Sequence, residues 1–420
     1  MKNNHRFLSS ILIAVFMFTI PMCVKAQTKN YPYVNPTPGE ITILASTPFP
    51  PGVKSSHQGY EDIVDCGFNL VTEGYSTQNY LHEFSLIGNL KLKYLVASTD
   101  FYNGKAKSFV NTFKRNKYVA GWKFKDEPAY KDLATYQKSY QELYQLAPDK
   151  LIFMNLFGSL EGDYKKTMKD YKAMVEYVDK MYRPQMLSFD MYPMFIKNGK
   201  LSVAYDTFFT ALEAMYSVSK QSQRPFWSYV QSMAFKAGTT VRPPANEAYL
   251  SFAVFSALAY GAQGIAYWTY AQRKSSSTEN YTSALIDLKG NKTKAWYDAK
   301  KVNALVKRFN HVFYESNVVE VRHTGSKIYN NTTKLSGAIG PFSSITSGNA
   351  GVLVSRIETK SGKFIVLVNH DVTATQKVTL KVAKTKKVAD LTDAKETQYG
   401  EESQISKTLS KGGIAIFQEI

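Results

Sequence analysis

Residues 119–157, VAGWKFKDEPAYKDLATYQKSYQELYQLAPDKLIFMNLF, contain two short apolar runs separated by one long amphipathic segment. The first run begins at Val119 and the second at Lys150, and both have the length and composition of buried strands. Between them, apolar residues recur at steps of three and four residues, which predicts a helix. A strand, a helix and a second strand in this order favour a right-handed crossover between parallel strands.

The same alternation extends over most of the chain. Helical patterns separate successive apolar runs, and a further helical segment, KAWYDAKKVNALVKRFNHVFY, follows the last of them. Eight such units predict a (β/α)8 TIM barrel. An open doubly wound sheet is the alternative, but no glycine-rich phosphate loop follows the first run. The eight runs begin at Glu40, Phe68, Leu92, Val119, Lys150, Met186, Pro225 and Gly264.

The composition changes after about Tyr314. The segment GVLVSRIETKSGKFIVLVNHDVTATQKVTLKVA alternates apolar and polar residues with turn signals between the runs, which predicts antiparallel strands. We therefore expect a barrel over residues 27–314 and a small all-β sandwich packed on it over residues 315–420.

The first residues have the features of a secretory signal peptide. Lys2 and Arg6 precede an apolar run, and small residues lead to a cleavage site after Ala26. We expect residues 1–26 to be removed and the protein to be secreted or periplasmic, without stable membrane insertion, because the apolar run is short and interrupted. A surface lipoprotein through Cys23 is disfavoured, because Met22 is a poor neighbour for that cleavage.

Charge and motifs exclude several classes of function. The formal net charge is +18, but the lysines are scattered along the helical segments, which argues against a nucleic-acid partner. The histidines show no metal-ligand spacing, and neither a dinucleotide fingerprint nor a phosphate loop occurs, so no metal or cofactor is predicted. After signal removal Cys66 is the only cysteine, so the core must supply the stability.

The strand ends carry the residues that indicate a function. The active site of a parallel barrel lies at the carboxyl ends of its strands. Cleavage of a glycosidic bond needs two carboxyl groups, and aromatic faces stack against the C–H surface of a sugar. At these ends the sequence places Glu73, Asp100, Asp126, Glu127, Asn155, Asp190 and Gln231, together with Tyr75, Tyr192, Trp227, Tyr229, Trp268 and Tyr270.

Four segments, GWKFKDEP, LSFDMYP, FWSYVQS and LAYGAQGIAYWTY, resemble secreted bacterial members of the large clan of barrel glycoside hydrolases that includes β-galactosidases. The resemblance implies that Glu127 is the acid/base proton donor. Asp126 stands where the clan has an asparagine that contacts a sugar hydroxyl. The clan's nucleophile is a glutamate at the end of strand seven, where this chain has Gln231. Asp190, at the end of strand six, is the best substitute.

Each candidate also has a purely structural interpretation. Asp126 could cap a helix that starts near Pro128, and Glu127 could be an acid of its first turn. Asp190 could form an Asx turn. Trp227 and Trp268 could belong to the core, because alternate residues of a barrel strand point inward.

The sequence predicts a glycoside hydrolase that cleaves a polysaccharide or oligosaccharide, with Glu127 and Asp190 as the catalytic carboxylates. The alternative is a carbohydrate-binding protein on a barrel without catalysis, suggested by the missing acid on strand seven. A structural surface protein is a third possibility. The predicted substrate contacts are Asp126, Glu73, Asn155, Tyr192, Trp227, Tyr229, Gln231, Trp268 and Tyr270.

Overall fold

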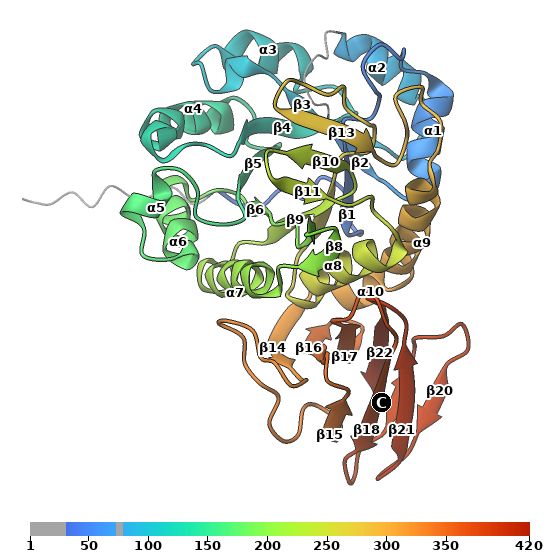
Figure 1. Cartoon of the computed structure of the whole chain (residues 1–420). Helices are drawn as coiled ribbons and strands as arrows, with labels where there is room; N and C mark the ends of the chain where they lie inside the picture. Colours follow the sequence, from blue (N-terminus) through green and yellow to red (C-terminus); the bar gives the residue numbers. More distant parts are fainter. Residues whose placement is uncertain (1–30, 73–78) are drawn as a thin grey trace, which may run out of the picture.

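The structure, a computed structural model, describes residues 31–72 and 79–420. Within these residues, eight parallel strands close into a barrel in the order β1-β12-β9-β6-β5-β4-β3-β2 (Figure 1). The closed barrel confirms the predicted fold and excludes the open sheet. Its strands are β1 (Thr42–Ser46), β2 (Leu70–Thr72), β3 (Lys93–Ala97), β4 (Val119–Asp126), β5 (Leu151–Phe157), β6 (Leu187–Asp190), β9 (Phe226–Gln231) and β12 (Gly264–Trp268).

Helices surround the barrel and cover its outer face (Figure 1). Most strand residues are buried, because the helices cover one side of each strand and the barrel interior the other. Two short 3-10 turns, Thr99–Phe101 and Tyr130–Asp132, follow β3 and β4. The helices are α1 (His57–Asp65), α2 (Tyr80–Ile87), α3 (Ala106–Phe113), α4 (Leu133–Leu146), α5 (Tyr164–Thr167), α6 (Tyr171–Tyr182), α7 (Tyr205–Ser222), α8 (Glu247–Ala259), α9 (Lys294–Arg308) and α10 (Asn310–Phe313).

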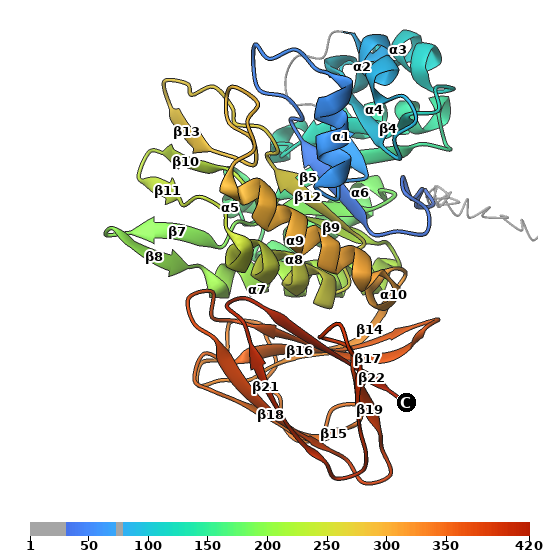
Figure 2. The same cartoon turned by 90° about the vertical axis from the view of Figure 1, so that its right-hand side faces the viewer.

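Two small antiparallel sheets are inserted after barrel strands and extend from one end of the barrel. A hairpin of β7 (Met194–Lys197) and β8 (Lys200–Val203) follows β6. A second sheet has the order β11-β10-β13, formed by β10 (Ala234–Ala237) and β11 (Thr240–Arg242) after β9 and by β13 (Glu279–Ser283) after β12. Figure 2 shows both sheets on the same side of the barrel. They follow the carboxyl ends of their strands and thus surround the predicted site.

The C-terminal region is antiparallel, as predicted. In the described chain, one sheet has the order β14-β16-β17-β22-β19-β20 and a second has the order β15-β18-β21. Apolar side chains of both sheets, among them Val354, Leu380 and Phe417, form a separate core between them. The strands are β14 (Asn317–His323), β15 (Phe342–Ser347), β16 (Val352–Thr359), β17 (Gly362–Asn369), β18 (Gln376–Val382), β19 (Val388–Asp390), β20 (Thr397–Tyr399), β21 (Gln404–Leu409) and β22 (Ile414–Glu419).

Helix α8 joins the two regions. Its sequence, EAYLSFAVFSALA, is apolar on nearly all sides, and residues Leu250–Ala259 are buried. Such a helix needs cover on both faces. The barrel covers one face and the sandwich the other, where the Ser355 hydroxyl of β16 donates a 2.7 Å hydrogen bond to the Ala259 carbonyl. The sandwich therefore packs on the side of the barrel, away from the carboxyl ends of the strands (Figure 2).

Candidate active site

A pocket of about 260 Å³ opens at the carboxyl end of the barrel. Small-molecule sites generally range from ~300 to 1,000 Å³, so this pocket is small and its walls can all reach one ligand. Most of its lining is polar. The lining residues are Asp126, Glu127, Asn155, Asp190, Tyr192, Tyr229, Trp268, Arg273 and Glu279.

The end of β4 has an irregular backbone that directs its acids into the pocket. The pairing register with β5 shifts between Lys123 and Lys125, which indicates a bulge. Bulges beside active sites re-aim side chains. Glu127, which directly follows the last residue of β4, has a φ of 43°, in the left-handed region that non-glycine residues rarely occupy. Its N–H donates a 2.9 Å hydrogen bond to the Asn155 carbonyl, which holds this unusual backbone in place.

Glu127 and Asp190 form a pair of adjacent carboxyls, close enough for one to hydrogen-bond the other. The Glu127 side chain is accessible through the pocket mouth, yet the pocket walls remove much of its hydration. This burial, together with the charge of Asp126, raises the pKa of Glu127 to about 7. Burial and the neighbouring charge of Glu127 raise the pKa of Asp190 well above its ordinary value. At neutral pH the pair therefore holds a proton.

One carboxylate oxygen of Asp190 is a buried hydrogen-bond acceptor. Within the described part of the chain, its Oδ1 atom has no hydrogen-bond partner. A buried carboxylate oxygen costs free energy unless a donor reaches it. The adjacent Glu127 carboxyl is such a donor when it is protonated. The unpaired oxygen and the raised pKa thus both indicate a proton between these side chains.

Asn155 organises the centre of the site from β5. Its Nδ2 donates to Asp126 Oδ1 at 3.2 Å, and its Oδ1 accepts a 2.9 Å hydrogen bond from the Ser188 hydroxyl of β6. A side-chain hydrogen bond between Asn155 and Asp190 lowers the pKa of Asp190 and so moderates its rise. Lys123 lies 3.9 Å from the other oxygen of Asp126. Asp126 is thus held on the β4 wall by two neighbours.

Close backbone packing fixes the position of Asp190. It ends β6, where it lies beside Phe157 of β5 and Tyr229 of β9. Gly158 follows directly on β5, and a Cβ atom there would lie only 2.0 Å from the Asp190 carbonyl oxygen. Only glycine allows the two strands to approach this closely.

Aromatic side chains line the pocket beside the carboxylates. Tyr192 and Trp268 stack with ring centroids 5.7 Å apart and an interplanar angle of 21°. The hydroxyl of Tyr229 accepts a 3.4 Å hydrogen bond from Ser46 of β1. The site therefore combines carboxylates with flat apolar faces, which suits a sugar.

Two lining residues were not predicted from the sequence. Arg273 and Glu279 come from the long segment between β12 and α9, and Glu279 begins β13. The strand-end rule does not reach them, because they lie beyond the first turn after the strand. The length of this segment was the only signal, since long loops in compact domains are frequently functional.

Of the eleven predicted catalytic and contact residues, the structure brings seven together and places three elsewhere, namely Trp227, Tyr270 and Gln231. Trp227 is fully buried near the start of β9, where its Nε1 donates to the Tyr33 hydroxyl at 3.3 Å. The hydroxyl of Tyr270 accepts a 3.0 Å hydrogen bond from Trp296 among the outer helices. Neither residue lines the pocket, and Glu73 lies outside the described residues. The seven are Asp126, Glu127, Asn155, Asp190, Tyr192, Tyr229 and Trp268.

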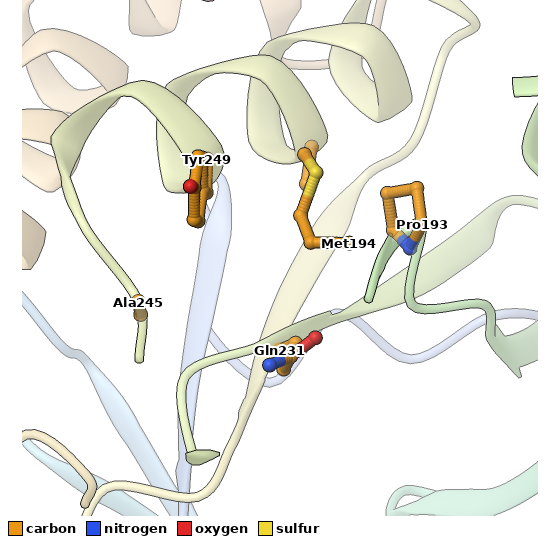
Figure 3. Close-up of a pocket in the computed structure, with 6 residues that line it drawn as sticks. Pro193, Met194, Gln231, Ala245 and Tyr249 are labelled. Atoms are coloured by element: carbon orange, nitrogen blue, oxygen red, sulfur yellow. The ribbon is translucent and has the colours of Figure 1, made fainter. Parts of the chain in front are cut away.

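Gln231 ends β9 but lines a different, much smaller pocket with Pro193, Met194 and Tyr249 (Figure 3). Its Nε2 donates to the Pro243 carbonyl at 2.9 Å and to the Met233 carbonyl at 3.2 Å. These bonds turn the side chain away from the carboxylates. Strand seven therefore contributes Tyr229 to the candidate active site but no carboxylate.

The alternative interpretation of Asp126 as a helix cap is wrong. Helix α4 begins at Leu133, and its N-cap residue is Asp132. Asp126 belongs to β4 and bonds to Asn155 instead. Glu127 likewise precedes the helix and its preceding 3-10 turn, so it is not an acid of the first helical turn.

No group of three His, Cys, Asp or Glu residues that could hold a metal ion occurs among residues 31–72 and 79–420. Over the same residues, no helix has both the length and the apolar composition required to cross a membrane.

A family model described as β-galactosidase, glycoside hydrolase 42, matches residues 133–309. The matched segment includes Asp190 and Glu279 but begins after Glu127. No curated protein matches the chain significantly.

The solved structures that are similar to this chain are distant from it in sequence. A catalytic mutant of a GH42 β-galactosidase from G. stearothermophilus is 9% identical with a TM-score of 0.59, covering 93% of this chain and 100% of that chain. A glycoside hydrolase family 5 protein from Bacteroides vulgatus is 10% identical with a TM-score of 0.53, covering 90% and 89%. A β-galactosidase from Marinomonas ef1 is 11% identical with a TM-score of 0.48, and this chain spans 59% of its length.

The barrel, the trailing sandwich and the family match together define the class of this protein. It is a glycosidase on a (β/α)8 barrel, related to the clan that includes β-galactosidases. Neither the fold nor the family match supports a binding protein without catalysis.

Proposed function

We propose that the protein is a secreted enzyme that cleaves glycosidic bonds in an oligosaccharide or polysaccharide, with Glu127 as the general acid. The observation that carries the proposal is the adjacent pair of Glu127 and Asp190 in a pocket with aromatic walls. A general acid must hold a proton at the working pH and must release it readily. A carboxyl with a pKa of about 7 meets both requirements.

Asp190 supports this proton rather than attacking the sugar. Carboxyls that act on opposite sides of a glycosidic bond are ~5–5.5 Å apart in retaining enzymes and ~6.5–9.5 Å apart in inverting enzymes. Side chains in hydrogen-bonding reach are closer than either value. The contact between Glu127 and Asp190 therefore leaves no room for a sugar carbon between them, and Asp190 orients the proton of Glu127.

The proposed substrate is a neutral sugar unit. Asp126 and Asn155 can accept and donate hydrogen bonds to hydroxyl groups, and the stacked rings of Tyr192 and Trp268 offer a surface for C–H groups. The description of the matched family makes β-galactosides the first substrates to test. Residues 1–26 support export, and the mature chain should begin at Gln27 when its mass is measured from cell fractions.

The test is hydrolysis of aryl glycosides and oligosaccharides by the parent chain and by Glu127→Gln. Loss of a general acid should lower kcat by about 10²–10⁴-fold on glycosides with poor leaving groups. Dinitrophenyl glycosides should suffer less, because their leaving group departs without protonation. Asp132→Asn is the matched control, since Asp132 lies on the same segment outside the pocket. A parent that binds sugar but hydrolyses nothing, or a fully active Glu127→Gln, would contradict the proposal.

A further inference from the structure

The pocket needs a second catalytic carboxylate that does not touch Glu127. Hydrolysis requires an ionised carboxylate across the anomeric carbon from the acid, either to attack the carbon or to activate water. Among the described residues, the other acids that line the pocket are Asp126, Asp190 and Glu279. Asp190 is in contact with Glu127, and Gln231 at the end of β9 carries no charge and faces another pocket.

Asp126 is on the wrong side of the pocket for this role. It directly precedes Glu127 on β4, so both acids project from the same wall. Its carboxylate is held there by Asn155 and Lys123. A group on the same wall as the acid cannot approach the anomeric carbon from the opposite face.

Glu279 comes from the opposite wall. In the barrel order, β12 is separated from β4 by three strands in either direction, so the two strands are diametrically opposed. Glu279 begins β13, which follows β12, and pairs with Ala237 of β10. Its side chain and that of Glu127 thus enter one pocket from two sides of the barrel.

Hydrogen bonds with neighbouring residues hold Glu279 and its carboxylate in place. The Tyr281 hydroxyl donates a short hydrogen bond to Glu279 Oε2. The Ser276 hydroxyl accepts the Glu279 N–H at 3.0 Å, which fixes the turn before the strand. Tyr281 itself is buried against Phe235 and Trp268, and this aromatic cluster anchors β13 on the end of β12.

We propose that Glu279 is the second catalytic carboxylate, placed across the bound sugar from Glu127; the inference rests on the proposed hydrolase function. As a nucleophile, its carboxylate bonds to the anomeric carbon while the C–O bond to the leaving group breaks and the Glu127 proton passes to the leaving oxygen. Water then attacks that carbon, returns a proton to Glu127 and releases Glu279. As a base, Glu279 instead takes the proton of the attacking water, and the product anomer is inverted.

The experiment compares Glu279→Gln with Glu127→Gln on a dinitrophenyl glycoside and on an unactivated glycoside. Loss of Glu279 should lower kcat by at least about a thousandfold on both substrates, because the second carboxylate acts whatever the leaving group. Loss of Glu127 should mainly affect the unactivated substrate. Asn280→Ala is the control, since Asn280 is exposed on the same strand. A Glu279→Gln enzyme within about tenfold of the parent on both substrates would overturn the proposal.

Azide supplies a readout beyond activity. In Glu279→Ala it should restore turnover of the dinitrophenyl glycoside and yield a glycosyl azide, because the small anion fits the space left by the carboxylate. Rescue by azide of Asp126→Ala or Asp190→Ala, but not of Glu279→Ala, would assign the role to another acid and overturn the proposal. Tyr281→Phe tests positioning: it should lower kcat with little change in KM.

A binding measurement separates this inference from the proposed function. A protonated iminosugar carries positive charge where the anomeric centre develops it, so it should bind at least about tenfold more weakly to Glu279→Gln than to the parent or Asn280→Ala. If the parent hydrolyses nothing, the proposed function fails, and this calorimetric difference still decides whether Glu279 faces the sugar. Equal iminosugar binding by parent and Glu279→Gln would overturn the inference.

Discussion

The pocket and the interface between barrel and sandwich both bury ionisable groups, but the two regions differ in whether these groups have hydrogen-bond partners. At the interface, His323 Nδ1 lies 3.2 Å from His370 Nε2, and His323 Nε2 lies 2.9 Å from the Tyr260 hydroxyl. His370 Nδ1 lies 3.1 Å from the Ala350 carbonyl oxygen. All four ring nitrogens thus have partners. Burial lowers the pKa of His323, and it lowers that of His370 to about 4, so both rings are neutral at pH 7.

In the pocket, by contrast, polar groups remain available to a proton or a ligand. Asp190 has a buried oxygen without a partner in the described chain, Glu127 has a positive φ, and its pKa is raised into the neutral range. Such features cost free energy and persist where function requires them. The interface uses polar groups to fix a contact, whereas the pocket keeps them available for a proton and a ligand. Substitutions in the two regions should therefore change different observables.

Among substitutions that compare the pocket with the interface, the largest effect is expected from Gly158→Ala. Its Cβ atom would lie 2.0 Å from the Asp190 carbonyl, so the end of β5 or β6 must shift. Overpacking of this kind costs about 1–3 kcal/mol of stability, and a displacement near 1 Å at a catalytic group can cost about 10²-fold in rate. We expect kcat/KM to fall by about that factor, measured together with thermal unfolding.

Gly400→Ala is the matched control in the sandwich, because a Cβ atom there meets no neighbour within 4 Å. It should leave activity and unfolding unchanged. Full activity of Gly158→Ala would show that the position of Asp190 is not critical, and the contrast between pocket and interface would lose its main support.

His370→Gln should act on stability instead of activity. The pKa of His370 is lowered from 6.5 to about 4, so the unfolded chain binds more protons than the folded chain between these pH values. The parent should therefore lose up to about 3 kcal/mol of stability from this group as the pH falls from 6.5 to 4. This loss should be absent in the variant, whose stability at pH 7 is lower because a buried partner is altered.

The measurement is chemical denaturation at pH 7 and pH 5 for the parent, His370→Gln and His82→Gln, a control on the surface of α2. Glu213, bonded to Tyr260, has a raised pKa and acts in the opposite direction, but it is common to all three proteins. An identical dependence on pH in the parent and in His370→Gln would mean that the interface does not exclude the charged ring.

The sequence was sufficient for the barrel because its signals are local. Each of the eight predicted runs forms a barrel strand, and the strand-end rule found Glu127 and Asp190. The rule does not say how close to the pocket end of the barrel a residue of the strand lies. Trp227 and Tyr229 lie on the same face of β9, so both were predicted to contact the substrate. Tyr229, two residues further along the strand, reaches the pocket, whereas Trp227 does not.

Long-range structure accounts for what the sequence did not provide. Glu279 enters the pocket only because β13 pairs with β10 from another loop, and no local pattern encodes that pairing. The direction of Gln231 depends on the carbonyl of Pro243, which lies beyond β11. The contact between Glu127 and Asp190 depends on the bulge in β4 and the close approach at Gly158.

The smallest predicted effect is a shift in the pH profile of Asp126→Asn. A general acid is active below its pKa and is lost above it, so kcat/KM of the parent should decline above pH 7. The negative charge of Asp126 raises the pKa of Glu127, and its removal should move this alkaline limb to lower pH. Because the Asp126 side chain is 54% exposed, solvent screens its charge and the shift should be less than about one unit.

The direction of this pH shift distinguishes an electrostatic effect of Asp126 on Glu127 from a loss of substrate binding. A variant that only binds substrate less well should have a lower kcat/KM at every pH, with the limb unmoved. Asp132→Asn, which lies outside the pocket, should leave both the rate and the limb unchanged. If the alkaline limb moves to higher pH in Asp126→Asn, the titrating group is not a carboxyl whose pKa is raised by the charge of Asp126. This result would thereby remove Glu127 as the acid while leaving the histidine pair at the interface unaffected.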